Sequence, residues 1–205
     1  MNATTRLGER LGVEWLTYNP LVYQFFHEKA LENSPGLSAG ICEQYPDLRR
    51  LADVGCGTGV FARAMMDRGL EVTACEYSPR ARRYARGLGV DVGEWRLQPH
   101  LDQKLRGGPF DAVTSFEVAE HIPEPLADRF CDFIAAAPLI ILSAAPPGQG
   151  GHGHINEQPQ QYWIEKLDAR GYDHDPDGSK RLTYECMQRG VADWLANNFM
   201  VFHRR

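Results

Sequence analysis

The stretch Asp53-Val54-Gly55-Cys56-Gly57-Thr58-Gly59 joins an apolar segment, residues 51–54, to a segment of helical periodicity, residues 61–69. This arrangement predicts a strand, a glycine turn and a helix. Glycine at three alternate positions lets a ligand lie directly against the backbone, because no Cβ intervenes. A dinucleotide-binding turn has the spacing G-x-G-x-x-G, but Val60 stands where that pattern has its last glycine. No lysine follows the turn, so it is not a phosphate-binding Walker loop either.

On both sides of this turn the chain alternates between strand and helix patterns. Ser78 followed by Pro79 is typical of a helix start, since serine caps the first turn and proline suits its first position. Strands are predicted at residues 51–54, 70–75, 110–116, 139–142 and 199–203, and further helices at residues 125–136 and 159–170. Strands that alternate with helices of this length form parallel βαβ units. We therefore expect an α/β fold with a doubly wound, mostly parallel sheet, whose ligand lies at the carboxyl ends of the strands.

Residues 1–46 are expected to form a small helical cap over a main domain at residues 47–205. This N-terminal segment contains helix formers and a group of aromatic residues: Trp15, Tyr18, Tyr23, Phe25 and Phe26. The sequence Asn33-Ser34-Pro35-Gly36 is typical of a turn, so several short helices are predicted rather than one long helix. Tyr18, Tyr23 and Phe26 are candidates for a lid.

The composition is that of a soluble globular protein: of 205 residues, 43% are hydrophobic and 24% are charged. Its 22 basic against 27 acidic residues give a net charge of −5, which counts against a broad nucleic-acid or membrane surface. The arginine-rich helix at residues 80–86 is expected to present a solvated face. No apolar run has the length of a transmembrane helix, and the N-terminus lacks the apolar core of a secretion signal. Five widely spaced cysteines without a CxxC pair favour reduced thiols, so we expect a cytoplasmic protein. The short N-terminal cap and the last helix leave room for a homodimer.

The glycine turn and two segments that follow it resemble class I S-adenosylmethionine-dependent methyltransferases. The similarity covers about residues 48–172 and includes the turn at residues 53–59, Glu76 after the second strand, and Phe110-Asp111-Ala112-Val113. It implies a Rossmann-like, seven-stranded sheet that binds S-adenosylmethionine. In this family the glycines let the methionine part pass close to the chain, and an acidic residue after strand two accepts both ribose hydroxyls. That role falls to Glu76, and either Glu94 or Trp95 is expected at the adenine.

The resemblance therefore implies a set of cofactor-binding residues. They are Asp53, Gly55, Cys56, Gly57, Gly59, Glu76, Tyr77, Glu94, Trp95, Phe116 and Glu117.

A cluster of acidic and imidazole side chains follows the predicted strand at residues 110–116. Glu117, Glu120 and His121 are spaced i, i+3, i+4, which places all three on one face if this turn is helical. Two carboxylates that converge are costly without a cation between them. Glutamate and histidine together suit Mg²⁺, Mn²⁺, Fe²⁺, Co²⁺ or Zn²⁺, and the residues do not choose among these ions. A metal-free pocket shaped by the same residues is the alternative.

The order E-V-x-E-H followed by a later histidine resembles two groups of metal-dependent O-methyltransferases. One group modifies the 3′-terminal 2′-hydroxyl of small RNAs, and the other acts in the ubiquinone pathway. The resemblance implies that Glu117, Glu120, His121 and His154 hold a divalent metal, most simply Mg²⁺ or Mn²⁺. His152 is a competing ligand or a general base, so His121, His152 and His154 are the candidate catalytic residues.

The predicted chemistry is methyl transfer to a hydroxyl. A metal lowers the pKa of a hydroxyl that it binds, and a neutral histidine can take the proton. A metal also favours an acceptor with two neighbouring oxygens. Residues 143–163 supply amides, glycines and aromatic rings and resemble bacterial saccharide methyltransferases, so a sugar or similar diol is the expected acceptor. An RNA 3′-end, a catechol, a metal-free methyltransferase with a histidine base, and a binding module without turnover are the alternatives.

Overall fold

The computed structural model describes residues 20–98 and 104–205, in which one seven-stranded sheet has the order β3-β2-β1-β4-β5-β7-β6. The strands are β1 (Arg50–Val54), β2 (Glu71–Glu76), β3 (Val92–Glu94), β4 (Ala112–Phe116), β5 (Leu139–Ser143), β6 (Tyr172–His174) and β7 (Phe199–Arg204). The helices are α3 (Pro20–Gln44), α4 (Val60–Asp67), α5 (Pro79–Gly87), α6 (Ala127–Ile134), α7 (Gln160–Asp168), α8 (Pro176–Gln188) and α9 (Asp193–Ala196), with 3₁₀ turns η1 (Ala119–His121) and η2 (Glu124–Leu126). Strands β1 to β5 pair in parallel, and β7 runs antiparallel to both β5 and β6. The doubly wound, mostly parallel sheet predicted from the sequence is confirmed.

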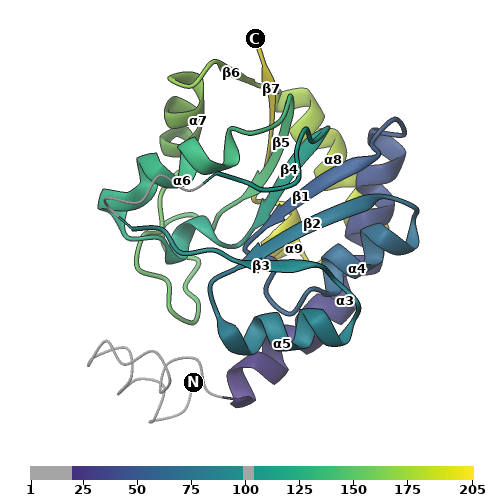
Figure 1. Ribbon diagram of the computed structural model, residues 1–205. Helices are drawn as coiled ribbons and strands as arrows, with labels where there is room; N and C mark the ends of the chain where they lie inside the picture. The colour runs from purple at the N-terminus through teal and green to yellow at the C-terminus, as the bar shows by residue number, and fades with distance from the viewer. Residues whose placement is uncertain (1–19, 99–103) are drawn as a thin grey trace.

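Helices cover both faces of the sheet (Figure 1). Helices α6 and α7 lie on one face and α3, α4 and α8 on the other, and each face has its own cluster of buried apolar side chains. Strand β5 is buried along its whole length, as expected for the middle of a sheet covered on both faces. Within the described residues, no helix combines the length and apolar character that crossing a bilayer requires.

The carboxyl ends of five parallel strands meet at one edge of the sheet. Val54 at the end of β1 pairs with Cys75, Glu76 at the end of β2 pairs with Glu94, and Phe116 at the end of β4 pairs with Ser143. These registers bring the glycine turn, the acidic end of β2 and the segment after β4 side by side. The predicted ligand position at this edge follows directly from the topology.

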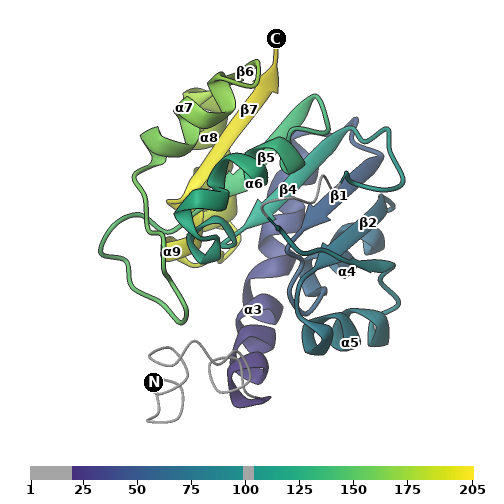
Figure 2. The same cartoon turned by 60° about the vertical axis from the view of Figure 1, so that its left-hand side comes forward.

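The prediction of several short helices in the N-terminal segment is wrong for residues 20–44. These residues form the single helix α3, which runs through the expected turn and contains Pro35. Figure 2 shows that the first part of α3 extends beyond the sheet, whereas its later part packs beside α4. Leu37 and Ile41 belong to the same apolar cluster as the sheet. Trp15 and Tyr18 lie outside the described residues, and the domain boundary at residue 46 stays a prediction.

Close packing explains why the turn signal fails. A Cβ on Gly36 would lie 2.6 Å from the carbonyl oxygen of Arg189, and one on Gly40 would lie 2.8 Å from Cys186 Sγ. Asn33 donates to the carbonyl of Lys29 and accepts from the backbone N–H of Ala192. The residues that usually break a helix therefore let α3 approach α8 and the segment after it.

Residues 171–198, where no element was predicted, contain β6, α8 and α9. Helix α8 begins with Asp175 as its cap, whose carboxylate accepts from Gly178 N, and with Pro176 in its first turn. The helix start that was predicted at Ser78 and Pro79 is confirmed, and the Ser78 side chain accepts from Ala81 N.

Candidate active site

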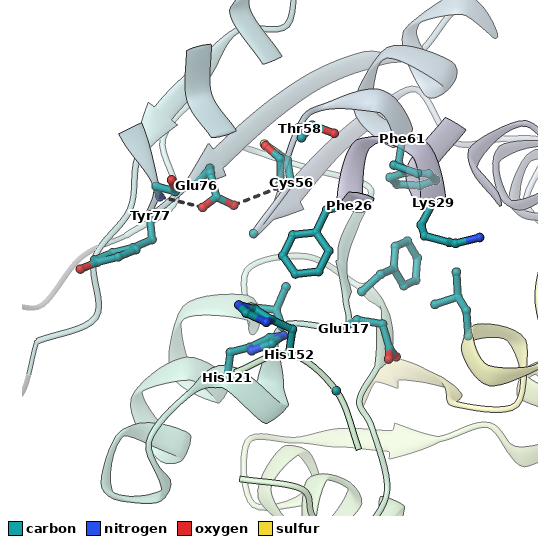
Figure 3. Close-up of a pocket in the computed structure, with 18 of the residues that line it drawn as sticks. Phe26, Lys29, Cys56, Thr58, Phe61, Glu76, Tyr77, Glu117, His121 and His152 are labelled. Atoms are coloured by element: carbon teal, nitrogen blue, oxygen red, sulfur yellow. Dashed lines mark hydrogen bonds between the residues drawn. The ribbon is translucent and has the colours of Figure 1, made fainter. Parts of the chain in front are cut away.

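A cavity of about 880 Å³ opens at the carboxyl edge of the sheet. The glycine turn, the end of β2, the segment after β4, the glycine-rich loop before α7, and α3 all contribute to its wall (Figure 3). Twelve of the predicted site residues line it: Asp53, Gly55, Cys56, Gly57, Glu76, Tyr77, Trp95, Phe116, Glu117, His121, His152 and His154.

The three glycines of the turn have different structural roles, although all have positive φ. A Cβ on Gly55 would lie 2.5 Å from Val118, so this glycine permits the segment after β4 to approach. Gly57 has no neighbour within 4 Å of a Cβ position and donates its N–H to Glu76 at 2.9 Å. Gly59 is not among the lining residues, and a Cβ there would lie 2.6 Å from Ala85 of α5. The first two glycines shape the cavity, whereas the third permits two helices to pack.

The partly buried carboxylate of Glu76 lies at the end of β2 and faces the cavity. It accepts from Gly57 N at 2.9 Å and from Ser78 N at 2.7 Å, drawn as dashed lines in Figure 3. Burial raises the pKa of Glu76 above its usual range. A carboxylate oxygen accepts more than one hydrogen bond, so both oxygens can still accept from a ligand.

Arg82 is not part of a solvated face, contrary to the expectation for its helix. It is 7% exposed, and its Nη1 donates to the carbonyl oxygens of Glu76 and Tyr77 at 2.8 and 2.6 Å. Its Nη2 donates to Glu94 at 3.1 Å. Arg82 therefore holds the backbone of Glu76 and Tyr77 in place. No spacing in the sequence distinguishes Arg82 from the other arginines of its helix.

Glu94 and Trp95, the two residues predicted to contact adenine, lie in different surroundings at the end of β3. Trp95 is buried, stacks on Phe133 with ring centres 5.3 Å apart, and lines the cavity. Glu94 is not among the lining residues, and its carboxylate pairs with Arg82. Of these two residues, the structure brings Trp95 to the cavity.

Three buried polar atoms of cavity-lining residues have no hydrogen-bond partner. They are Asp53 Oδ2, Thr58 Oγ1 and Trp95 Nε1. Burial raises the pKa of Asp53 to about 7, although its Oδ1 accepts from Thr114 at 3.0 Å. Buried polar atoms without partners are costly, so this wall fits a ligand that carries both donors and acceptors.

Glu117 does not share a helical face with Glu120 and His121. It lies before η1 with a φ of 53°, a left-handed conformation uncommon for a non-glycine residue. Its two carboxylate oxygens accept from Asn198 Nδ2 at 3.1 Å and from Gln149 Nε2 at 3.2 Å. Sequence reasoning missed both amides, because their partner is distant in the chain.

Glu120, His121 and His154 come together beside the cavity. One ligand atom from each lies within 4.8 Å of the others. Glu120 is fully buried, and neither of its carboxyl oxygens has a hydrogen-bond partner. Burial and then the nearby Glu117 raise the pKa of Glu120 well above its usual range. Three of the four predicted metal ligands are therefore adjacent, and Glu117 is outside this group.

The two histidines of this group are oriented by the loop before α7. His121 Nδ1 lies 3.0 Å from the carbonyl oxygen of Gly153, and burial lowers the pKa of His121 to about 4. His154 Nε2 lies 3.8 Å from Glu120 Oε1, and its ring is perpendicular to that of His121. A carboxylate without hydrogen-bond partners and two imidazoles form a donor set that fits a divalent cation.

Aromatic side chains of α3 close the cavity on the side of the loop. Tyr23 and Phe26 line the cavity and meet edge to face, and the Phe26 ring lies 6.0 Å from that of His152. Figure 3 shows His152 beside His121 and below Phe26. This places a third imidazole at the cavity.

The chain is similar to known methyltransferases. A family model described as a methyltransferase domain matches residues 52–132. The ubiquinone biosynthesis O-methyltransferase of Xanthomonas oryzae pv. oryzae (strain PXO99A) is 38% identical over 160 residues, which cover 72% of this chain and 61% of the relative. That of Xylella fastidiosa (strain 9a5c) is 37% identical over 82 residues, 38% of this chain and 33% of the relative. The chain therefore spans between a third and about three fifths of the length of these two relatives.

Solved structures share the fold. The amino pentose methyltransferase CalS10 from Micromonospora echinaspora has a TM-score of 0.66 at 17% identity, with 90% of this chain and 97% of that chain covered. The sugar N-methyltransferase KedS8 from Streptoalloteichus sp. has a TM-score of 0.64 at 16% identity, with 90% and 93% covered. The chain thus carries a methyltransferase domain at residues 52–132, on the Rossmann-like fold that these structures share.

Proposed function

We propose that the protein is an S-adenosylmethionine-dependent O-methyltransferase that uses a divalent metal and an acceptor with two neighbouring hydroxyls. The match to a methyltransferase domain and the cavity at the carboxyl edge of the sheet support the transferase activity. The relatives named as O-methyltransferases support oxygen as the acceptor atom.

One observation supports the metal part of the proposal most strongly. The Glu120 carboxyl is fully buried, has no hydrogen-bond partner, and lies next to the side chains of His121 and His154. Burying a carboxylate without compensation is strongly unfavourable. A cation among Glu120, His121 and His154 removes that cost, and the group lies next to the proposed cofactor wall. These three residues are among the four, with Glu117, that the family resemblance implies as ligands.

In this proposal, some residues bind the cofactor and others bind the cation or act on the acceptor. When bound, S-adenosylmethionine supplies an electrophilic methyl group, and a divalent cation lowers the pKa of an acceptor hydroxyl. Glu76 accepts from the ribose hydroxyls, and Trp95 contacts the adenine. Glu120, His121 and His154 hold the cation, and His152 takes the proton from the acceptor. Phe26 and Phe116 exclude water from the reacting atoms.

A saccharide diol is the acceptor class expected from the amides and aromatic rings of residues 143–163. A catechol-type small molecule is the second candidate, and two observations favour it. The cavity is lined by three phenylalanine rings, those of Phe26, Phe61 and Phe116. The relatives are named for ubiquinone biosynthesis. A metal-free reaction with a histidine base and an RNA 3′-end stay the alternatives.

The test is transfer of labelled methyl from S-adenosylmethionine to a catechol and to a methyl glycoside with vicinal hydroxyls. We expect transfer to one of them, loss of transfer after treatment with a chelator, and recovery when Mg²⁺ or Mn²⁺ is added. A Glu165→Gln variant, changed on the exposed surface of α7, should behave like the wild type. Transfer that is insensitive to chelation would contradict the metal, and no transfer to either acceptor would contradict the diol class.

A further inference from the structure

Glu157, at the end of the glycine-rich loop, binds three groups of that loop at once. Its Oε1 accepts from Gly150 N at 2.7 Å and lies 2.8 Å from His154 Nδ1, and its Oε2 accepts from Gly148 N at 2.8 Å. A carboxylate is only an acceptor when ionised, so Nδ1 of His154 carries the proton in this contact. The partners span residues 148–154, which is the part of the loop that lines the cavity.

The contact with Glu157 fixes the direction of the second ring nitrogen of His154. In the neutral ring with its proton on Nδ1, Nε2 keeps a lone pair, and this nitrogen lies 3.8 Å from Glu120 Oε1. The loop backbone also confines the ring, because a Cβ on Gly151 would lie 2.1 Å from His154 Nε2. The imidazole is therefore held by a carboxylate on one nitrogen and by close backbone packing around the other.

Other residues of the same loop form hydrogen bonds with Glu117 and Glu120. Gln149, between the two glycines that donate to Glu157, donates from its side chain to Glu117. Ile155 N and Asn156 N both donate to the carbonyl oxygen of Glu120 at 3.0 Å. The conformation of residues 148–156 thus determines where His154 lies relative to the two glutamates.

We propose that Glu157 is a positioning residue, which selects the Nδ1–H tautomer of His154 and holds the glycine-rich loop against the site. The proposal deepens the proposed function, on which its metal-binding consequence rests. A carboxylate that accepts from the second nitrogen of a metal-binding histidine commonly raises metal affinity. Sequence reasoning gave Glu157 no role, because a glutamate three residues after a histidine is also typical of an ordinary surface.

The first test is a ¹⁵N–¹H spectrum of the histidine side chains at mildly alkaline pH, with metal-free protein. The wild type should show His154 as a single Nδ1–H tautomer. Glu157→Ala should show a mixture of tautomers, and Glu157→Gln should keep the wild-type tautomer because its amide oxygen still accepts. Glu165→Ala is the matched control and should leave the spectrum unchanged. An Nε2–H tautomer in the wild type, or an unchanged tautomer in Glu157→Ala, would overturn the proposal.

The second test is the affinity of the same proteins for Mn²⁺. Glu157→Ala should bind Mn²⁺ at least about tenfold more weakly, whereas Glu165→Ala should match the wild type. In a Glu157→Ala, His154→Ala double variant, the Glu157 change should cost no further affinity, since it acts through His154. Equal affinity of Glu157→Ala and wild type would count against the proposal. If wild-type protein binds no Mn²⁺, the metal part of the proposed function fails, and the tautomer spectra still decide the role of Glu157.

Discussion

Glu117 and Glu120 lie three positions apart, and both are largely buried, but their carboxylates have different surroundings. Asn198 and Gln149 each donate a hydrogen bond to Glu117. Neither oxygen of Glu120 has a partner, and its near neighbours at ligand distance are His121 and His154. Two amide donors compensate the burial of the Glu117 carboxylate, whereas Glu120 lacks such donors and is available to a cation.

The role proposed for Glu76 predicts a selective loss of cofactor binding. In Glu76→Gln, the amide group places a donor where Gly57 N, Ser78 N or a ribose hydroxyl needs an acceptor. We expect the affinity for S-adenosylhomocysteine to fall by about 10- to 100-fold, or about 1.4–3 kcal/mol. Calorimetric titration measures this. Glu71→Gln, at the exposed start of the same strand, is the control, and equal affinity of both variants would refute the ribose assignment.

The buried carboxyl of Asp53 predicts a pH dependence of stability. Burial raises its pKa from 3.8 to about 7 in the folded chain, so between about pH 4 and pH 7 the folded state binds more protons than the unfolded state. The contribution of Asp53 to stability therefore falls as the pH rises through this window. In the cofactor-free protein, Asp53→Asn should gain stability relative to the wild type from pH 4 to pH 8, on the order of a few kcal/mol. Urea unfolding of both proteins at pH 4 and pH 8 measures their difference in the free energy of unfolding. The same difference at both pH values would be inconsistent with a raised pKa of Asp53.

At the scale of elements, α3 shows where local signals mislead. Asn33-Ser34-Pro35-Gly36 has the composition of a turn, and an isolated peptide of this sequence has little reason to be helical. In the folded protein Asn33, Ser34 and Gly36 are buried, and Asn33 and Gly36 contact the end of α8 and the segment after it. Tertiary packing decides this helix, and packing between distant segments is not visible in a local pattern.

This account predicts opposite effects for two helical glycines. Gly36→Ala should destabilise the protein by about 1–3 kcal/mol, because its Cβ would meet the backbone of Arg189. Gly87→Ala, at the end of α5, meets nothing within 4 Å and should be neutral or stabilising by up to about 1 kcal/mol. Thermal unfolding of the two variants measures the difference. Equal melting temperatures would show that α3 does not pack as closely as described.

At the scale of the whole molecule, the sequence predicted the sheet and one side of the site. Apolar runs predicted β1, β2, β4, β5 and β7, and the glycine turn with Glu76 followed because these residues end neighbouring parallel strands. The other side depends on contacts between segments far apart in the chain. The bonds from Gln149 and Asn198 to Glu117 are such contacts, and no spacing rule relates their members.

The central claim, that Glu120, His121 and His154 hold a divalent cation beside the cofactor cavity, is most directly tested by calorimetric titration of Mn²⁺. The protein is stripped with a chelator and saturated with S-adenosylhomocysteine, and Glu120→Gln is titrated in parallel. The account predicts binding near one ion per chain in the wild type and its loss in Glu120→Gln, with cofactor affinity unchanged. Two results would contradict the claim. One is that the wild type binds no Mn²⁺ even when a vicinal diol is present to complete the coordination. The other is that Glu120→Gln binds Mn²⁺ as well as the wild type does.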